Sequence, residues 1–107
     1  MKQISASELA AWLADASRDP PLLLDVREPW EYEKARIAGA QLVLMREVPA
    51  RLEEIDPDKE VVAICHHGGR SQQVAMFLEK AGYTKIHNLA GGVDAWSRTI
   101  DPSVPLY

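Results

Sequence analysis

The chain has 107 residues, of which 47% are hydrophobic and 26% charged, and its formal net charge is −4 at pH 7. A chain of this size and composition can bury a core without disulfide or metal support, which excludes a disordered or fibrous protein. The negative charge argues against nucleic acid as a partner, and no apolar run approaches the roughly 20 residues of a membrane span, so we expect a cytoplasmic protein whose single cysteine stays reduced.

Apolar spacing and turn residues predict an alternation of helices and strands along the chain. Ser5 and Glu8 form the pattern of a capping box at the start of the first helix. Pro29 is typical of the first turn of a second helix, and Gly82 is typical of a helix C-terminus. The predicted elements are helices over residues 5–16, 28–35, 47–55, 71–83 and 93–100, and strands over 22–26, 40–45, 60–65 and 85–89. This alternation predicts an α/β fold with a parallel sheet and helices on both of its faces.

The helix over 71–83 has the clearest periodicity. Its apolar side chains recur at helical spacing and are expected to form the buried face: Val74, Phe77, Leu78 and Ala81. The three tryptophans are expected to pack in the core or at its rim: Trp12, Trp30 and Trp96.

The only cysteine, Cys65, follows a predicted strand and precedes this helix. In an open α/β sheet, ligands bind at the carboxyl ends of the strands, where loops meet helix N-termini. Backbone amides and the positive end of a helix that starts near Ser71 would stabilise the thiolate, which is the nucleophilic form of cysteine. Gly68 and Gly69 allow a tight turn with inward-pointing amides, and Arg70 adds a fixed charge. The loop is therefore predicted to bind an anion that reacts with the cysteine sulfur.

Two other interpretations of this loop exist. Cys65 could be a small buried hydrophobe at the end of a core strand. It could also bind a metal together with His66 and His67, although adjacent residues rarely point at one ion and the sequence has no CxxC or HxxxH pair. Two glycines, an arginine and two histidines are poor core material, so we favour the reactive cysteine. The two histidines either contact a substrate or simply lie in the turn.

The segment "CHHGGRS", residues 65–71, resembles the C-x-x-G-x-R-[ST] active-site loop of rhodanese domains, the thiosulfate sulfurtransferases. Three further segments are similar to family motifs in the same order: "LLLDVREPWEY" (22–32), "RIAGA" (36–40) and "NLAGGVDAW" (88–96). The resemblance implies that residues 1–107 form a single rhodanese domain with a three-layer fold, in which a mainly parallel sheet of about five strands lies between helices. Ala35 and Arg36 depart from the Gly-His of many members, and Arg36 is expected to present a charge near the loop.

The resemblance also implies a sulfur-transfer chemistry. Cys65 would take a sulfane sulfur from thiosulfate or a persulfide donor and pass it to a thiophilic acceptor, such as cyanide, a thiol or a sulfur-carrier protein. A thioredoxin-like reductant is a further candidate partner, and no metal or organic cofactor is needed. The catalytic residues would be Cys65 and Arg70. The residues expected to contact substrate are His66, His67, Gly68, Gly69, Ser71 and Arg36. Those expected to support the loop are Asp25, Arg27, Gly91 and Gly92.

Two alternative functions belong to the same fold. Certain dual-specificity phosphatases and arsenate reductases carry a C-x5-R loop, which is one residue longer than the segment from Cys65 to Arg70. Non-catalytic rhodanese-like interaction domains commonly lack the cysteine that this chain retains. Loop length and the cysteine therefore favour sulfur chemistry.

Overall fold

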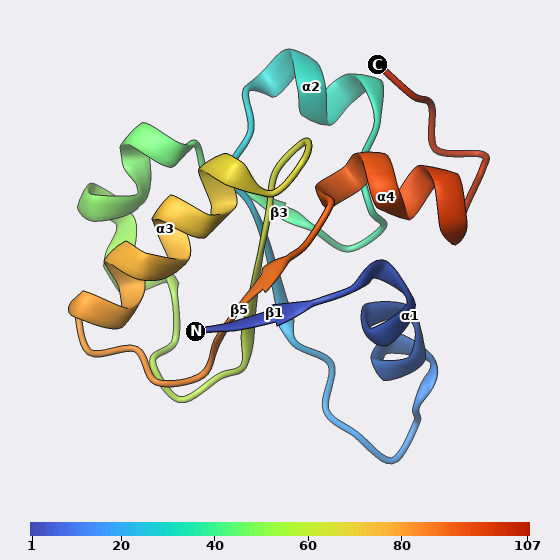
Figure 1. The fold of residues 1–107 in the computed structure, drawn as a ribbon. Coiled ribbons are helices and arrows are strands. Elements are labelled where there is room, and N and C mark those ends of the chain that lie inside the picture. The colour runs from blue at the N-terminus through green and yellow to red at the C-terminus, as the bar shows by residue number, and fades with distance from the viewer.

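The computed structural model describes residues 1–107 and contains one sheet of five parallel strands in the order β1-β5-β4-β2-β3. The strands are β1 (Lys2–Ile4), β2 (Leu22–Asp25), β3 (Gln41–Leu42), β4 (Val61–Ile64) and β5 (Ile86–Leu89). β4 lies at the centre of the sheet, between β2 and β5 (Figure 1).

Helices cover both faces of this sheet, as the alternating pattern predicts. They are α1 (Ala6–Ala14), α2 (Pro29–Lys34), the 3-10 helix η1 (Met45–Glu54), α3 (Gly69–Lys80) and α4 (Gly92–Thr99). α3 and η1 lie together on one side of the sheet, and α1 and α4 lie together on the other (Figure 1). The three-layer α/β fold expected from the sequence is therefore confirmed. None of the helices is both long and apolar enough to cross a membrane.

Alternating side chains of β4 build the two halves of the core and fix the orientation of the cysteine. Val62 and Ile64 belong to the buried cluster on the α1 and α4 side. Val61, Ala63 and Cys65 belong to the cluster on the α3 and η1 side. Because successive residues of a strand point to opposite faces, Cys65 continues this alternation one residue beyond β4 and directs its side chain toward α3.

The edges of the sheet differ from the sequence-based prediction. β1 was not predicted, because its three residues are too few to show a period, yet Lys2 and Ile4 pair with His87 and Leu89 of β5. β3 is shorter than the predicted strand over 40–45. The chain still follows β2 for a few residues, since the Val43 N–H donates to the Asp25 carbonyl at 2.9 Å, and it then turns into η1.

Two helices also differ from the prediction, and the second of them shares residues with the loop. η1 is a 3-10 helix that begins at Met45, and Pro49 within it has no N–H to donate to a regular helical ladder. α3 begins at Gly69 rather than near Ser71, with Gly68 as its N-cap residue, and ends at Lys80. Residues 69–71 of the predicted 65–71 loop thus belong to the start of a helix.

The predicted buried face of α3 is partly wrong. Phe77 is 38% exposed and Ala81 is also exposed. The buried residues of α3 follow the spacing i, i+3, i+4 and i+7, and they are Ser71, Val74, Ala75 and Leu78. Phe77 instead borders a groove between α3 and η1, which Met45 and Pro49 also line. The sequence could not place it, because an apolar side chain at the edge of the stripe fits either position.

The expected packing of the tryptophans is confirmed for Trp12 and Trp96 and wrong for Trp30. Trp12 and Trp96 are buried in the cluster between the sheet, α1 and α4. Trp30, at the start of α2, is 60% exposed, and its ring meets that of Tyr107 edge to face with the centroids 5.7 Å apart.

Candidate active site

Cys65 lies at the carboxyl end of the central strand, with only 1% of the residue exposed. Its Sγ accepts a hydrogen bond from the Gly68 backbone N–H, with a distance of 3.0 Å between nitrogen and sulfur. The Ser71 Oγ lies 3.3 Å from Sγ, but it also reaches the Gly68 carbonyl and the Asn88 side chain. Because a serine hydroxyl has one proton to donate, the Gly68 amide is the fixed donor to the sulfur.

Most of the other backbone amides of the loop have no acceptor within the chain. The N–H groups of residues 66, 67 and 69–71 donate to no backbone or side-chain group. Three of these belong to the first turn of α3, where the helix dipole adds positive potential. The loop therefore places unpaired donors and the positive end of a helix around one sulfur, an arrangement that stabilises negative charge.

Gly68, not Gly69, is the glycine that the turn requires. Gly68 has a φ of +111°, a conformation that side chains disfavour, and its carbonyl accepts from the Asn88 amide at 3.2 Å. Gly69 has an ordinary φ, and a Cβ atom there would meet nothing within 4 Å. The expectation that both glycines permit the turn is thus corrected to Gly68 alone.

The start of α4, which carries Gly92, packs against the backbone of the 65–71 loop. The Val93 N–H donates to the Cys65 carbonyl at 2.9 Å, and the next amide donates to the His66 carbonyl at 3.1 Å. A Cβ atom on Gly92 would lie 2.3 Å from the Cys65 carbonyl oxygen and 2.4 Å from that of His66. Only a residue without a side chain allows this close approach.

Arg70 is held by a partner that the sequence analysis did not single out. Its NH1 and NH2 groups donate to the two carboxylate oxygens of Glu31, at 2.7 and 2.8 Å. Glu31 lies on α2 and is only 4% exposed. These bonds from Arg70 hold the pKa of Glu31 at about 2, and the pKa of Arg70 is raised in turn. The predicted fixed charge of Arg70 is therefore paired, and its orientation depends on Glu31.

Asp25 and Arg27 tie the end of β2 to α2. Both are fully buried, and the Arg27 NH2 group lies 2.7 Å from the Asp25 Oδ2. Arg27 also donates to the carbonyl of Ala35 at 2.6 Å and to that of Glu31 at 3.3 Å. Through Arg27, the pair contacts the backbone of the segment that carries Glu31.

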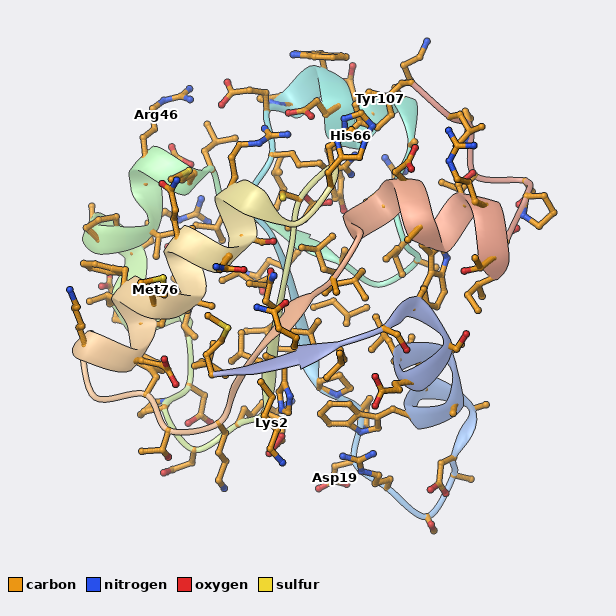
Figure 2. The ribbon with its side chains drawn as sticks, in the orientation of Figure 1. Lys2, Asp19, Arg46, His66, Met76 and Tyr107 are labelled. Atoms are coloured by element: carbon orange, nitrogen blue, oxygen red, sulfur yellow. The ribbon has the colours of Figure 1, made fainter.

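Tyr107 reaches the same network from the segment after α4. Its hydroxyl lies 2.7 Å from the Arg27 NH1 group and 3.0 Å from the Glu31 Oε2. Its ring stacks on that of His66, with the centroids 3.9 Å apart and the planes 11° from parallel (Figure 2). Burial of this hydroxyl raises the pKa of Tyr107 to about 12. No apolar periodicity in this proline-containing segment indicates the contact.

The remaining predicted site residues lie as follows. The half-buried ring of His66 lies between the rings of Tyr107 and His67, and its buried Nε2 has no hydrogen-bond partner. Burial, together with the neighbouring His67, lowers the pKa of His66. Arg36 is exposed and lies over the Tyr32 ring, where its NH1 group donates to the Tyr32 carbonyl at 3.3 Å. It forms no hydrogen bond or ion pair with the 65–71 loop.

One group of side chains near the loop has the composition of a metal site. The ligand atoms of His66, His67 and Asp94 lie within 4.8 Å of one another. This set differs from the one considered from the sequence, because it contains Asp94 instead of Cys65. The two imidazole rings are stacked, however, and a nitrogen lone pair lies in the plane of its ring. The Asp94 carboxylate also accepts from Arg98 at 2.9 Å. This arrangement would have to rearrange before it could bind one ion.

The Glu31 carboxylate should make the stability of the fold depend on acid pH. Its pKa of about 2 lies below the unfolded value of roughly 4.3, so its stabilising contribution is complete above the unfolded pKa and is lost as the pH falls toward 2. We expect Glu31→Gln to lower the unfolding free energy by about 1 to 3 kcal/mol near neutral pH, and this difference to shrink in acid. Urea unfolding of both proteins across this pH range measures the difference in unfolding free energy.

The control is Glu54→Gln. It removes an exposed carboxylate that accepts two hydrogen bonds from Arg51, and it should change stability much less. An equal loss in both variants would contradict the expectation.

The fold agrees with comparisons to known proteins. The sequence model of the rhodanese-like domain matches residues 5–99. The chain belongs to the rhodanese-like family. Two similar rhodanese-like relatives are a sulfurtransferase of Allochromatium vinosum and the thiosulfate sulfurtransferase GlpE of Coxiella burnetii. The first is 37% identical over 92% of this chain and 90% of its own length, and the second is 37% identical over 89% and 86%.

A third relative is longer than this chain. The rhodanese-like/PpiC domain-containing protein 12 of Arabidopsis thaliana chloroplasts is 36% identical over the whole chain, which spans 38% of that protein. Among solved structures, a rhodanese-like domain protein from Staphylococcus aureus has a TM-score of 0.85 and 29% identity, and the match covers all of this chain and 99% of that one. The rhodanese-like fold is therefore shared over nearly the full length.

Proposed function

We propose that this rhodanese-like chain is a sulfurtransferase in which Cys65 carries the transferred sulfur as a persulfide. The observation that carries the proposal is the position of the Cys65 sulfur, 3.0 Å from the Gly68 amide in a loop whose other amides are unpaired. Such donors can hydrogen-bond to an anionic sulfur, whether it is the thiolate that attacks or the persulfide that results.

The proposed reaction has two steps. The Cys65 thiolate attacks the outer sulfur of thiosulfate, so that a sulfur–sulfur bond forms on the cysteine and the bond to the sulfite group breaks, with sulfite leaving as the dianion. An acceptor nucleophile such as cyanide then attacks the terminal sulfur of the persulfide, which releases thiocyanate and restores the thiolate. A small persulfide can replace thiosulfate in the first step, and a thiol, a sulfur-carrier protein or a thioredoxin-like reductant can replace cyanide in the second. One cysteine is enough, because the acceptor resolves the intermediate.

The size of the loop supports sulfur rather than phosphate as the transferred group. Four residues separate Cys65 from Arg70, one fewer than in the phosphatases and arsenate reductases of related fold. The retained cysteine favours an enzyme over a non-catalytic interaction domain.

Intact-protein mass spectrometry tests this function directly. We expect thiosulfate to add one sulfur atom to the protein, and cyanide to remove it with the release of thiocyanate. The matched control is an aryl phosphate substrate, which should be hydrolysed far more slowly than sulfur is transferred. A protein that gains no sulfur from thiosulfate or from a small persulfide, or that hydrolyses the phosphate faster, would overturn the proposal.

A further inference from the structure

The hydroxyl of Tyr107 has one possible hydrogen-bond arrangement. A guanidinium group only donates, so the hydroxyl accepts from Arg27 NH1 at 2.7 Å. Its single proton is then directed to the ionised Glu31 Oε2, 3.0 Å away. Tyr107 therefore links the buried Arg27 to Glu31.

Glu31 is in turn the one protein group that orients the Arg70 guanidinium. The Arg70 side chain is 37% exposed, and both of its hydrogen bonds end on the Glu31 carboxylate. These two bonds leave the remaining N–H donors of Arg70 for a bound anion. Any movement of Glu31 would move these donors relative to Cys65.

The ring of Tyr107 contacts the start of the same loop, at the opposite end from Arg70. It stacks at 3.9 Å on His66, the residue that follows Cys65 (Figure 2). The Arg27 guanidinium lies 5.7 Å from the centre of the same ring. One side chain thus contacts both the start of the loop and the network that holds Arg70 near its end.

We propose that Tyr107 is a positioning residue of the active site, which fixes Arg70 through Glu31 and the start of the 65–71 loop through His66. The proposal rests on the sulfur transfer proposed above, since it concerns binding of the anionic donor. A tyrosine that only filled the core would stabilise the fold without affecting the donor.

Tyr107→Phe separates the two roles, because it keeps the stacked ring and removes only the hydroxyl. We expect the KM for thiosulfate to rise about tenfold, the size of one hydrogen bond to a charged group, with a much smaller change in kcat. Tyr107→Ala should raise the KM further, because it also loses the stack on His66. The matched control is Tyr83→Phe, whose hydroxyl bonds the Leu52 and Ile55 carbonyls at 2.9 and 3.0 Å, away from the loop. This control should lose stability but keep the KM of the wild type.

A second measurement tests Tyr107 independently of sulfur transfer. Iodoacetate is an anion and iodoacetamide is neutral, so the ratio of their reaction rates at Cys65 reports the positive potential near the sulfur. We expect Arg70→Ala and Tyr107→Phe both to lower this ratio, and Tyr83→Phe to leave it unchanged. A wild type that takes up no sulfur, with the ratio still lowered in Tyr107→Phe, would refute sulfur transfer and support the positioning role. An unchanged ratio and KM in Tyr107→Phe, or a variant that does not fold, would assign Tyr107 to the core and overturn the inference.

Discussion

Replacement of Cys65 with serine is expected to abolish sulfur transfer while the fold remains intact. Serine is smaller than cysteine, and its hydroxyl can accept from the Gly68 amide that now bonds to Sγ. A hydroxyl is a far weaker nucleophile than a thiolate and forms no persulfide, so transfer from thiosulfate to cyanide should fall by on the order of 10³-fold or more. Thiocyanate formation and the intact mass after thiosulfate treatment measure the loss.

Cys65→Ala serves as the control for the structure of the loop. It also lacks a nucleophile, but it leaves the Gly68 amide without its acceptor in a buried position. We expect Cys65→Ser to unfold within about 1 kcal/mol of the wild type and Cys65→Ala to be less stable than the serine variant. Because Cys65 is the only cysteine, substantial transfer in either variant would show that the sulfur is not carried on a thiol of this chain.

The features of the fold that could be predicted are those in which the interacting residues are close together in the sequence. The capping box of Ser5 and Glu8 is present with both of its hydrogen bonds, because both partners lie within one helical turn. The buried strand β4 and the helix after it were also predicted, since apolar runs and helical periodicity show these elements directly. The position of Cys65 at the carboxyl end of a strand followed from the alternation of elements, whereas the central place of that strand in the sheet did not.

The network that orients Arg70 could not be predicted in the same way. Arg70 and Glu31 are 39 residues apart in the sequence, and Glu31 and Tyr107 are 76 apart, so their contacts arise only when the sheet brings α2, the loop and the last segment together. Glu31 lay within the segment that resembled a family motif, but the resemblance did not indicate its partner. Tyr107 lay outside the four segments that resemble the family motifs. The electrostatics of the site therefore depend on tertiary contacts that local pattern does not encode.

The two glycine pairs also show what the sequence alone cannot predict. In sequence, Gly68-Gly69 and Gly91-Gly92 suggest the same explanation, a tight turn. In the structure, Gly69 has neither a positive φ nor a crowded Cβ position, whereas Gly92 has a φ of +59° and two carbonyl oxygens closer than any Cβ could tolerate. The requirement for glycine at position 92 comes from the packing of α4 against another loop, which no local rule reveals.

Gly92→Ala should therefore damage both the fold and the active site. The new Cβ would overlap the carbonyl oxygens of Cys65 and His66, at 2.3 and 2.4 Å, and neither can move without breaking its hydrogen bond from the start of α4. We expect a loss of about 2 to 5 kcal/mol in the free energy of unfolding, from steric overlap together with the strained φ. Urea unfolding measures this loss.

The matched control is Gly82→Ala, at the end of α3. Gly82 also has a positive φ, of +102°, but a Cβ atom there would meet nothing within 4 Å. This variant therefore carries the backbone strain without the overlap, and the difference between the two losses isolates the contact between α4 and the loop. Because the overlap moves the Cys65 backbone, the Gly92 variant that remains folded should also transfer sulfur more slowly than the Gly82 variant. Equal stability and equal transfer rates in the two variants would mean that the loop can shift away from α4 at little cost, and that this close approach does not set the position of Cys65.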